Sequence, residues 1–166
     1  LRTHVGLLEA GQRIATTLDG EKLFSIAAST FLASCQADAA AVFKKVDAGY
    51  EVGGTLGFSD PERQWLTETL TAQLRLLAPQ ISKAGERLTL SAIPDRFGSV
   101  FGVPAWHEET LLGAVLLFYT ADPAPAVETA APFLARHYSM GLRTLGKFSA
   151  FEDLVYLDDL THLFNS

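Results

Sequence analysis

The chain has 166 residues, a length that fits one domain with a core large enough to be stable alone. Its net charge of −6 and its lack of a basic stripe argue against a nucleic-acid-binding protein, and its longest apolar run, residues 111–119, is too short for a membrane helix, which needs ~20 residues. Hydrophobic residues nevertheless make up 48% of the chain, which suggests apolar surface buried both inside the fold and against a partner.

The first third of the chain predicts two helices followed by a β-hairpin. Apolar residues at helical spacing predict helices over residues 1–17 and 20–34, and Asp19 has the side chain expected of an N-cap for the second. The period then changes to that of strands over residues 39–47 and 50–56, with a short turn between them.

The rest of the chain predicts one more helix, a second hairpin and a long terminal helix. Pro61 marks the start of the helix, behind Ser59 or Asp60 as its cap, and leucines at helical spacing continue it to residues 78–79. The elements that follow are a short strand at 88–90, an irregular loop at 91–98, strands at 99–106 and 111–119, and a helix from Val127. Both of these last strands are apolar on both faces, so helices must cover the sheet on both sides. The order predicts an α+β domain built on an antiparallel sheet.

The last hairpin carries a family resemblance. Its sequence, SVFGVPAWHEETLLGAVLLFY, has a Val103-Pro104 pair on one strand and Leu112-Gly113-Ala114-Val115 on the other, and it resembles the last hairpin of GAF domains. Pro104 must lie where no backbone donor is needed, and Gly113 allows a neighbouring backbone to approach closely. The resemblance covers residues 10–145 and implies a GAF-like, PAS-related sensor domain.

The end of the chain resembles a second family. The sequence DDLTHLFN is similar to the DxLTxLxN motif that opens GGDEF diguanylate cyclase domains, although His162 replaces the usual glycine and Ser166 stands where arginine is common. The matching residues are Asp158, Leu160, Thr161, Leu163 and Asn165. The resemblance implies a sensor domain over residues 1–147, and a connector helix with the first residues of a GGDEF domain over 148–166. The cyclase that makes cyclic di-GMP from GTP would then follow, and this segment would not itself be an enzyme.

The terminal helix also predicts a homodimer. From Val127 onward, mostly apolar residues recur at alternating intervals of three and four positions, which is the pattern of a coiled-coil seam. The candidates for a dimeric signalling helix are Leu145, Phe148, Phe151 and Val155. For the first half of the helix, packing on the domain's own sheet is the alternative. A parallel dimer would place two cyclase domains face to face, as the GGDEF resemblance requires.

Residues 65–98 precede the last hairpin, where GAF domains generally form their ligand pocket. The candidates for a pocket that combines aromatic walls with a cation are Trp65, Arg75, Arg96, Phe97 and Trp106. A filled core with surface arginines is the alternative. The NKFDE-type motif of cyclic-nucleotide GAF domains is absent, and no residue identifies a ligand.

The histidines and the single cysteine bear on metal and thiol chemistry. No histidine is paired with another histidine, a cysteine or a carboxylate at a metal-ligand spacing, so we expect neither a metal nor another cofactor in this segment. Cys35 is the single cysteine, which excludes an internal disulfide and favours a cytoplasmic location.

From the two family resemblances we expect a sensor that binds a small ligand and controls a cyclase. The alternatives are a ligand-free GAF-type dimerisation scaffold and a redox enzyme that uses Cys35.

Overall fold

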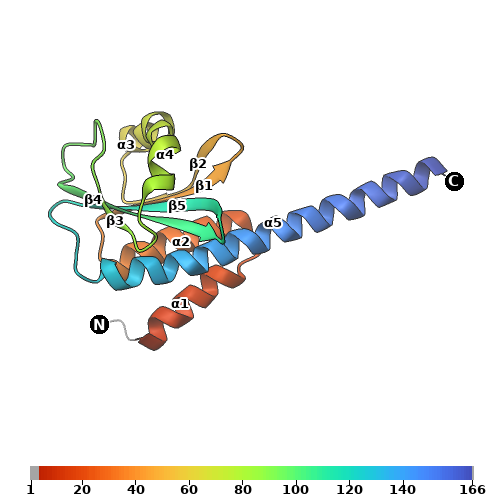
Figure 1. Cartoon of the computed structure of the whole chain (residues 1–166), viewed down its shortest axis with the longest axis horizontal. Helices are drawn as coiled ribbons and strands as arrows, with labels where there is room; N and C mark the ends of the chain where they lie inside the picture. Colours follow the sequence, from red (N-terminus) through yellow and green to blue (C-terminus); the bar gives the residue numbers. More distant parts are fainter. Residues whose placement is uncertain (1–3, 166) are drawn as a thin grey trace.

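The computed structural model describes the backbone of residues 4–165 and the side chains of residues 6–146. In chain order the elements are α1 (His4–Thr16), α2 (Gly20–Ser34), β1 (Ala39–Val46), β2 (Gly49–Leu56), α3 (Asp60–Trp65), a π-helical turn (Leu66–Leu70), α4 (Thr71–Leu77), a 3₁₀ turn (Ala78–Gln80), β3 (Glu86–Leu88), β4 (Ser99–His107), β5 (Thr110–Tyr119) and α5 (Val127–Asn165). The strands form one antiparallel sheet in the order β2-β1-β5-β4-β3. Figure 1 shows α3 and α4 on one side of this sheet and α1, α2 and α5 on the other. The predicted α+β architecture is confirmed.

Two hydrophobic cores fill the two faces of the sheet, as the apolar character of both faces predicts. Along β5 the side chains alternate, so that Val115 and Leu117 belong to the core under α1, α2 and α5, whereas Leu116 and Phe118 belong to the core under α3 and α4. All four side chains are fully buried. We call the second cluster the α3/α4 core; its members are Ala39, Ala41, Phe43, Tyr50, Phe58, Leu66, Leu70, Leu74, Ala78, Ile81, Leu88, Phe97, Val100, Leu111, Ala114, Leu116 and Phe118.

The starts of α2 and α3 are set by local side-chain caps. The Asp19 side chain accepts the backbone N–H of Lys22 at 3.3 Å, which confirms the predicted cap of α2. Ser59, rather than Asp60, caps α3 through a reciprocal capping box: its hydroxyl accepts the Glu62 N–H, and its own N–H donates to the Glu62 carboxylate at 2.8 Å. The pattern Ser-x-x-Glu, formed by Ser59 and Glu62, is visible in the sequence and explains why Ser59 rather than Asp60 is the cap.

The helix predicted from Pro61 to residues 78–79 contains a π-helical turn at Leu66–Leu70. Leucines recur there every four residues, at 66, 70 and 74, and each is fully buried. In an ideal α-helix of about 3.6 residues per turn, positions four apart drift around the axis. A wider π turn offsets that drift and keeps these leucines facing the sheet.

The short strand β3 lies two residues before its predicted position at 88–90. It begins after Gly85, whose φ of +87° turns the chain, and it pairs residues 86–88 with residues 100–102 of β4. A Cβ on Gly85 would come within 2.5 Å of the Phe101 ring. The register of β3 therefore depends on close packing at a glycine rather than on its apolar pattern.

Helix α5 is tied to the middle of the sheet at Tyr138. This side chain is fully buried, and its hydroxyl donates to the backbone carbonyl of Phe43 on β1 at 2.9 Å. It crosses β5 at Gly113, where a Cβ would overlap the Phe43 carbonyl oxygen and lie 3.2 Å from the Tyr138 ring. The predicted close approach at Gly113 is confirmed.

Replacing Tyr138 by phenylalanine should lower the free energy of unfolding by about 1–2 kcal/mol, because a buried hydrogen bond is lost while the ring is kept. Urea unfolding followed by circular dichroism measures the change. Tyr50→Phe is the matched control, since the buried Tyr50 hydroxyl has no hydrogen-bond partner among the described residues. That variant should be as stable as the parent or more so; equal losses in the two variants would contradict the proposed role of the Tyr138 hydroxyl.

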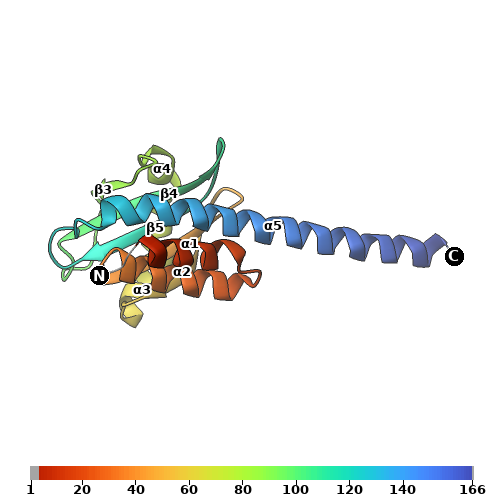
Figure 2. The same ribbon diagram turned by 90° about the horizontal axis from the view of Figure 1, so that it is seen from below.

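Beyond the sheet, α5 continues as one helix to Asn165 and projects away from the rest of the chain (Figures 1 and 2). Leu145 packs against the core under α1 and α2, so this candidate for the dimer seam contacts the domain itself. The side chains of Phe148, Phe151 and Val155 lie outside the described ones, as do those of the motif residues Asp158, Leu160, Thr161, Leu163 and Asn165. The boundary at residues 147 and 148 stays a prediction.

Candidate functional site

The space under α3 and α4, where the sequence predicts a ligand pocket, is filled by aromatic side chains. The Phe118 ring centroid is 5.1 Å from those of Phe58 and Phe97, and 6.1 Å from that of Trp65. Phe118 is fully buried and Phe97 is 5% exposed. Two of the predicted pocket residues, Trp65 and Phe97, therefore act as packing partners around Phe118.

The structure separates the five predicted pocket residues. Trp65, Arg96 and Phe97 lie close together around α3, whereas Trp106 is near the far end of β4, the strand that begins just after Phe97. Arg75 is exposed on α4. Trp106 and Lys83 form a cation–π pair, with the ammonium 5.4 Å from the ring centroid.

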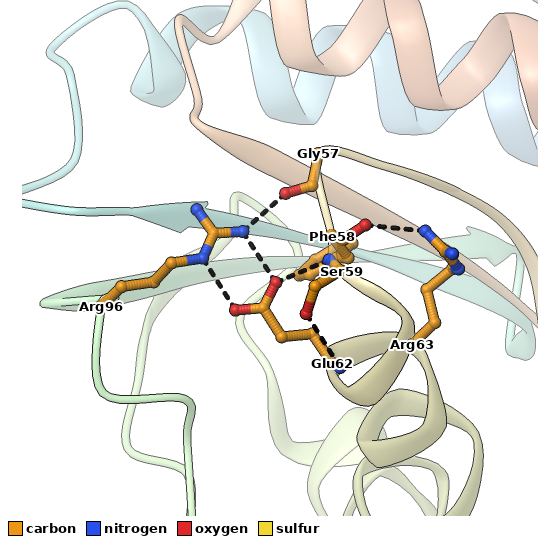
Figure 3. Close-up of polar contacts among 6 residues, drawn as sticks. All are labelled: Gly57, Phe58, Ser59, Glu62, Arg63 and Arg96. Atoms are coloured by element: carbon orange, nitrogen blue, oxygen red, sulfur yellow. Dashed lines mark hydrogen bonds and ion pairs between the residues drawn. The ribbon is translucent and has the colours of Figure 1, made fainter.

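Arg96 is held by an internal carboxylate rather than left free for a ligand (Figure 3). Its Nε donates to one Glu62 oxygen at 2.7 Å and a terminal nitrogen donates to the other at 2.9 Å, a bidentate ion pair. The same terminal nitrogen donates to the backbone carbonyl of Gly57 at 2.6 Å, and the guanidinium lies 4.1 Å from the Phe97 ring centroid. Arg96 thus fastens the loop before β4 to the start of α3.

Glu62 is the residue that sequence reasoning missed at this cluster. It completes the capping box with Ser59 and accepts both arms of Arg96, so one carboxylate holds the helix start and the loop. The hydrogen bond from Arg96 is the main cause that lowers the pKa of Glu62 from 4.5 to about 2. The capping-box spacing could have identified Glu62, but its pairing with Arg96 joins residues 34 positions apart and has no local signal.

Replacing Glu62 by glutamine should flatten the acid dependence of stability. Because the folded-state pKa lies below the unfolded value, the stabilisation is complete above pH 4.5 and is lost as the pH falls from 4.5 towards about 2. The parent should therefore lose more stability across this window than the Glu62→Gln variant, and the variant should be less stable at pH 7. Urea midpoints measured from pH 7 to pH 2 test this, with the exposed Glu68→Gln as the control. Parallel curves for parent and Glu62→Gln would contradict it.

The α3/α4 layer contains polar atoms without partners. Among the described residues, four buried side-chain atoms lack a hydrogen bond: Ser34 Oγ, Tyr50 Oη, Trp65 Nε1 and Trp106 Nε1. The last three belong to side chains that form or pack against the α3/α4 core. Buried polar groups are nearly always paired in folded proteins, so these atoms mark places where a further acceptor would stabilise the structure.

Among the residues whose side chains are described, three surface cavities between the helices and the edges of the sheet bear on the site. A cavity of about 550 Å³ is formed by the segment around β3 and the start of α5, and includes Gly85, Arg87, Phe101 and Pro125. Another, of about 360 Å³, lies between α2 and β2. The third, of about 310 Å³, is lined by Trp106, the one predicted pocket residue that lines any of these three cavities.

The described residues offer little support for metal or thiol chemistry. Within that part of the chain, no group of three or more His, Cys, Asp and Glu side chains is placed to hold a metal ion. Cys35 is fully buried, and burial raises the pKa of its thiol to about 12, which suppresses the reactive thiolate. The structure therefore gives no support to a redox enzyme built on Cys35. Across the same residues, no helix combines the length and apolar character needed to cross a membrane.

Comparison with known proteins identifies the fold. Neither a protein-family model nor a curated protein sequence matches the chain. Among solved structures, the GAF domain of a phosphoenolpyruvate-protein phosphotransferase from Coxiella burnetii is similar over 87% of this chain and 94% of its own, with 16% identity and a TM-score of 0.67. The GAF domain of a putative sensor histidine kinase from Pseudomonas syringae pv. tomato is similar over 90% and 89%, with 16% identity and a TM-score of 0.65.

A third similar solved structure is a chromophore-binding domain. The chromophore-binding domain of a bacteriophytochrome from R. palustris is similar over 86% of this chain and 60% of its own, with 13% identity and a TM-score of 0.64. Structural similarity at identities this low shows a shared architecture, and it does not show a shared ligand or activity. Together with the sheet order and the two helical layers, these similar structures show that the chain has the GAF fold.

Proposed function

We propose that this chain is the regulatory sensor domain of a signalling protein and that α5 carries its output. The observation that supports this most directly is the continuity of α5. Its first half supplies fully buried residues, Leu134 and Tyr138 among them, to the core on the sheet, and the same helix then runs on to Asn165 (Figures 1 and 2). A rearrangement of the sheet is therefore transmitted to the projecting part of the helix.

The contact between Tyr138 and Phe43 provides a route across the sheet. The Phe43 side chain is fully buried in the α3/α4 core, while its carbonyl accepts the Tyr138 hydroxyl from α5 on the opposite face. The pairing of β1 with β2 shifts register next to Phe43, between Val42 and Phe43. A change in packing under α3 and α4 thus reaches the output helix through one residue. A ligand must favour one of two such arrangements to produce a signal.

The effector that we propose is a diguanylate cyclase, on the basis of the DDLTHLFN motif at the end of α5. The full-length protein should then carry a GG[DE]EF sequence beyond Ser166 and should form cyclic di-GMP from GTP. Sequencing of the gene and a cyclase assay on the full-length protein test this directly. A different effector domain after Ser166 would reject the cyclase and leave the sensor function standing.

We propose that the chain signals through α5 as a homodimer, which sedimentation measurements test. The chain should sediment as a dimer at micromolar concentration, and replacing both Phe148 and Val155 by glutamate, at seam positions of the heptad pattern, should give a monomer. Asp153→Ala, off the seam in the same helix, is the control and should leave the dimer intact. A monomeric parent would reject the dimer.

A ligand-free dimerisation scaffold is the second candidate, and the filled α3/α4 core favours it. The two functions differ in their response to small molecules. A sensor should show a rise in melting temperature with a member of a metabolite panel, because a ligand that binds only the folded state stabilises it. A dimeric chain with no such response would support the scaffold.

A further inference from the structure

The outer edge of β4 is left uncovered where β3 ends. β3 pairs with residues 100–102 of β4, and within residues 4–165 no strand pairs with the following part of β4 on that side. The cavity of about 310 Å³ lies at this edge. We call it the β4-edge cleft; its lining includes Lys83, Pro104, Trp106, Glu108, Pro132 and Arg136.

The cleft brings together two cations from different parts of the chain. Lys83 comes from the turn before β3, and Arg136 comes from α5. Both side chains are exposed, and neither forms an ion pair with a carboxylate among the described residues. One carboxylate, that of Glu108, is also in the lining, so the cleft carries a net positive charge.

The cleft also contains a flat apolar surface. Trp106 is partly buried against the α3/α4 core, and its Nε1 has no acceptor among the described residues. Pro104 and Pro132 add apolar walls from β4 and α5. Two cations and flat apolar walls match a planar molecule that carries a negative charge.

We propose that the β4-edge cleft binds a small aromatic carboxylate, whose charge is held by Lys83 and Arg136 and whose ring lies against Trp106 and the two prolines. Lys83 lies over the indole ring, and a bound carboxylate would draw its flexible side chain aside. Because Arg136 belongs to α5, the ligand would join the turn before β3 directly to the output helix. An aromatic carboxylate would then be the ligand class of the proposed sensor. Its effect on signalling rests on the proposed sensor function.

Tryptophan fluorescence gives a direct binding test. The chain has two tryptophans, so the Trp65→Phe variant leaves Trp106 as the single reporter. Benzoate should produce a saturable change in its emission, whereas benzamide, which has nearly the same shape and no charge, should bind much more weakly. Calorimetric titration of the parent chain with benzoate checks that the Trp65→Phe change itself does not alter binding. Equal affinity for benzoate and benzamide would overturn the proposal.

Charge variants locate the site. Lys83→Ala and Arg136→Ala should each weaken benzoate binding about tenfold, the effect of losing one charge-assisted contact. Glu108→Gln should strengthen binding, because it removes the carboxylate that repels the ligand. Arg75→Ala is the matched control, since Arg75 is exposed and lines none of the three cavities. Unchanged affinity in the Lys83→Ala/Arg136→Ala double variant would overturn the site.

The site and the sensor function fail in different ways. Hydrogen exchange of α5, measured with and without benzoate, should slow on binding, because the ligand clamps Arg136. Saturable binding that depends on Lys83 and Arg136 without any change in α5 would support the site and reject its part in signalling. No binding to the cleft would reject this inference, while the dimer and cyclase measurements would still test the proposed function.

Discussion

Replacing Phe118 by alanine should lower the free energy of unfolding by about 3–5 kcal/mol, the cost of deleting a large aromatic side chain from a packed core. Phe118 is fully buried on β5, with strands on both sides of it. The rings of Phe58, Phe97 and Trp65 surround it at centroid distances between 5.1 and 6.1 Å. None of these neighbours can collapse into the space easily, because each is positioned by a different segment. Urea unfolding followed by circular dichroism measures the loss.

The matched control for Phe118→Ala is Leu76→Ala on α4. Leu76 is 76% exposed, so its removal should change the free energy of unfolding by less than about 0.5 kcal/mol. The comparison tests whether the α3/α4 core is as closely packed as its ring contacts indicate. A loss below about 1 kcal/mol for Phe118→Ala would mean that the site collapses or was loosely packed, and would reopen this layer as a ligand pocket.

The strands of the two hairpins were predictable because each is bounded by local signals. β4 and β5 are continuous apolar runs separated by a short polar turn, and their observed bounds differ from the predicted ones by one residue at one end each. Asp19 and Ser59 are caps with their partners three residues away, again a local relation. The two-sided core follows from strands that are apolar on both faces.

The candidate site was harder to predict, because its chemistry depends on distant pairings. An arginine such as Arg96 looks free in the sequence, and its partner Glu62 lies 34 positions earlier. Trp65 and Trp106 look equivalent as pocket walls, yet one packs in an aromatic cluster around Phe118 and the other lines a cleft at the sheet edge. The cleft itself arises because β3 is too short to cover β4, and a three-residue strand has little pattern of its own.

Replacing Gly113 by alanine should destabilise the fold by more than about 2 kcal/mol, because the added methyl group meets backbone rather than a movable side chain. The Cβ would overlap the carbonyl oxygen of Phe43, which β1 holds in place by pairing on both sides. It would also lie 3.2 Å from both Tyr138 and Leu142 of α5. Either β1 or the output helix must shift. Thermal and urea unfolding measure the loss of stability.

Gly49→Ala is the control for Gly113→Ala, since a Cβ at Gly49 would have no neighbour within 4 Å. It should change the free energy of unfolding by less than about 0.5 kcal/mol. The two variants make the same chemical change in the same sheet, so their difference isolates the close approach at Gly113. Hydrogen exchange of α5 should also speed up in Gly113→Ala, because the displaced Tyr138 loses its bond to Phe43. If the two glycine variants were equally stable, α5 would not be tied to the sheet at this point, and the route from the α3/α4 core to the output helix would have to run elsewhere.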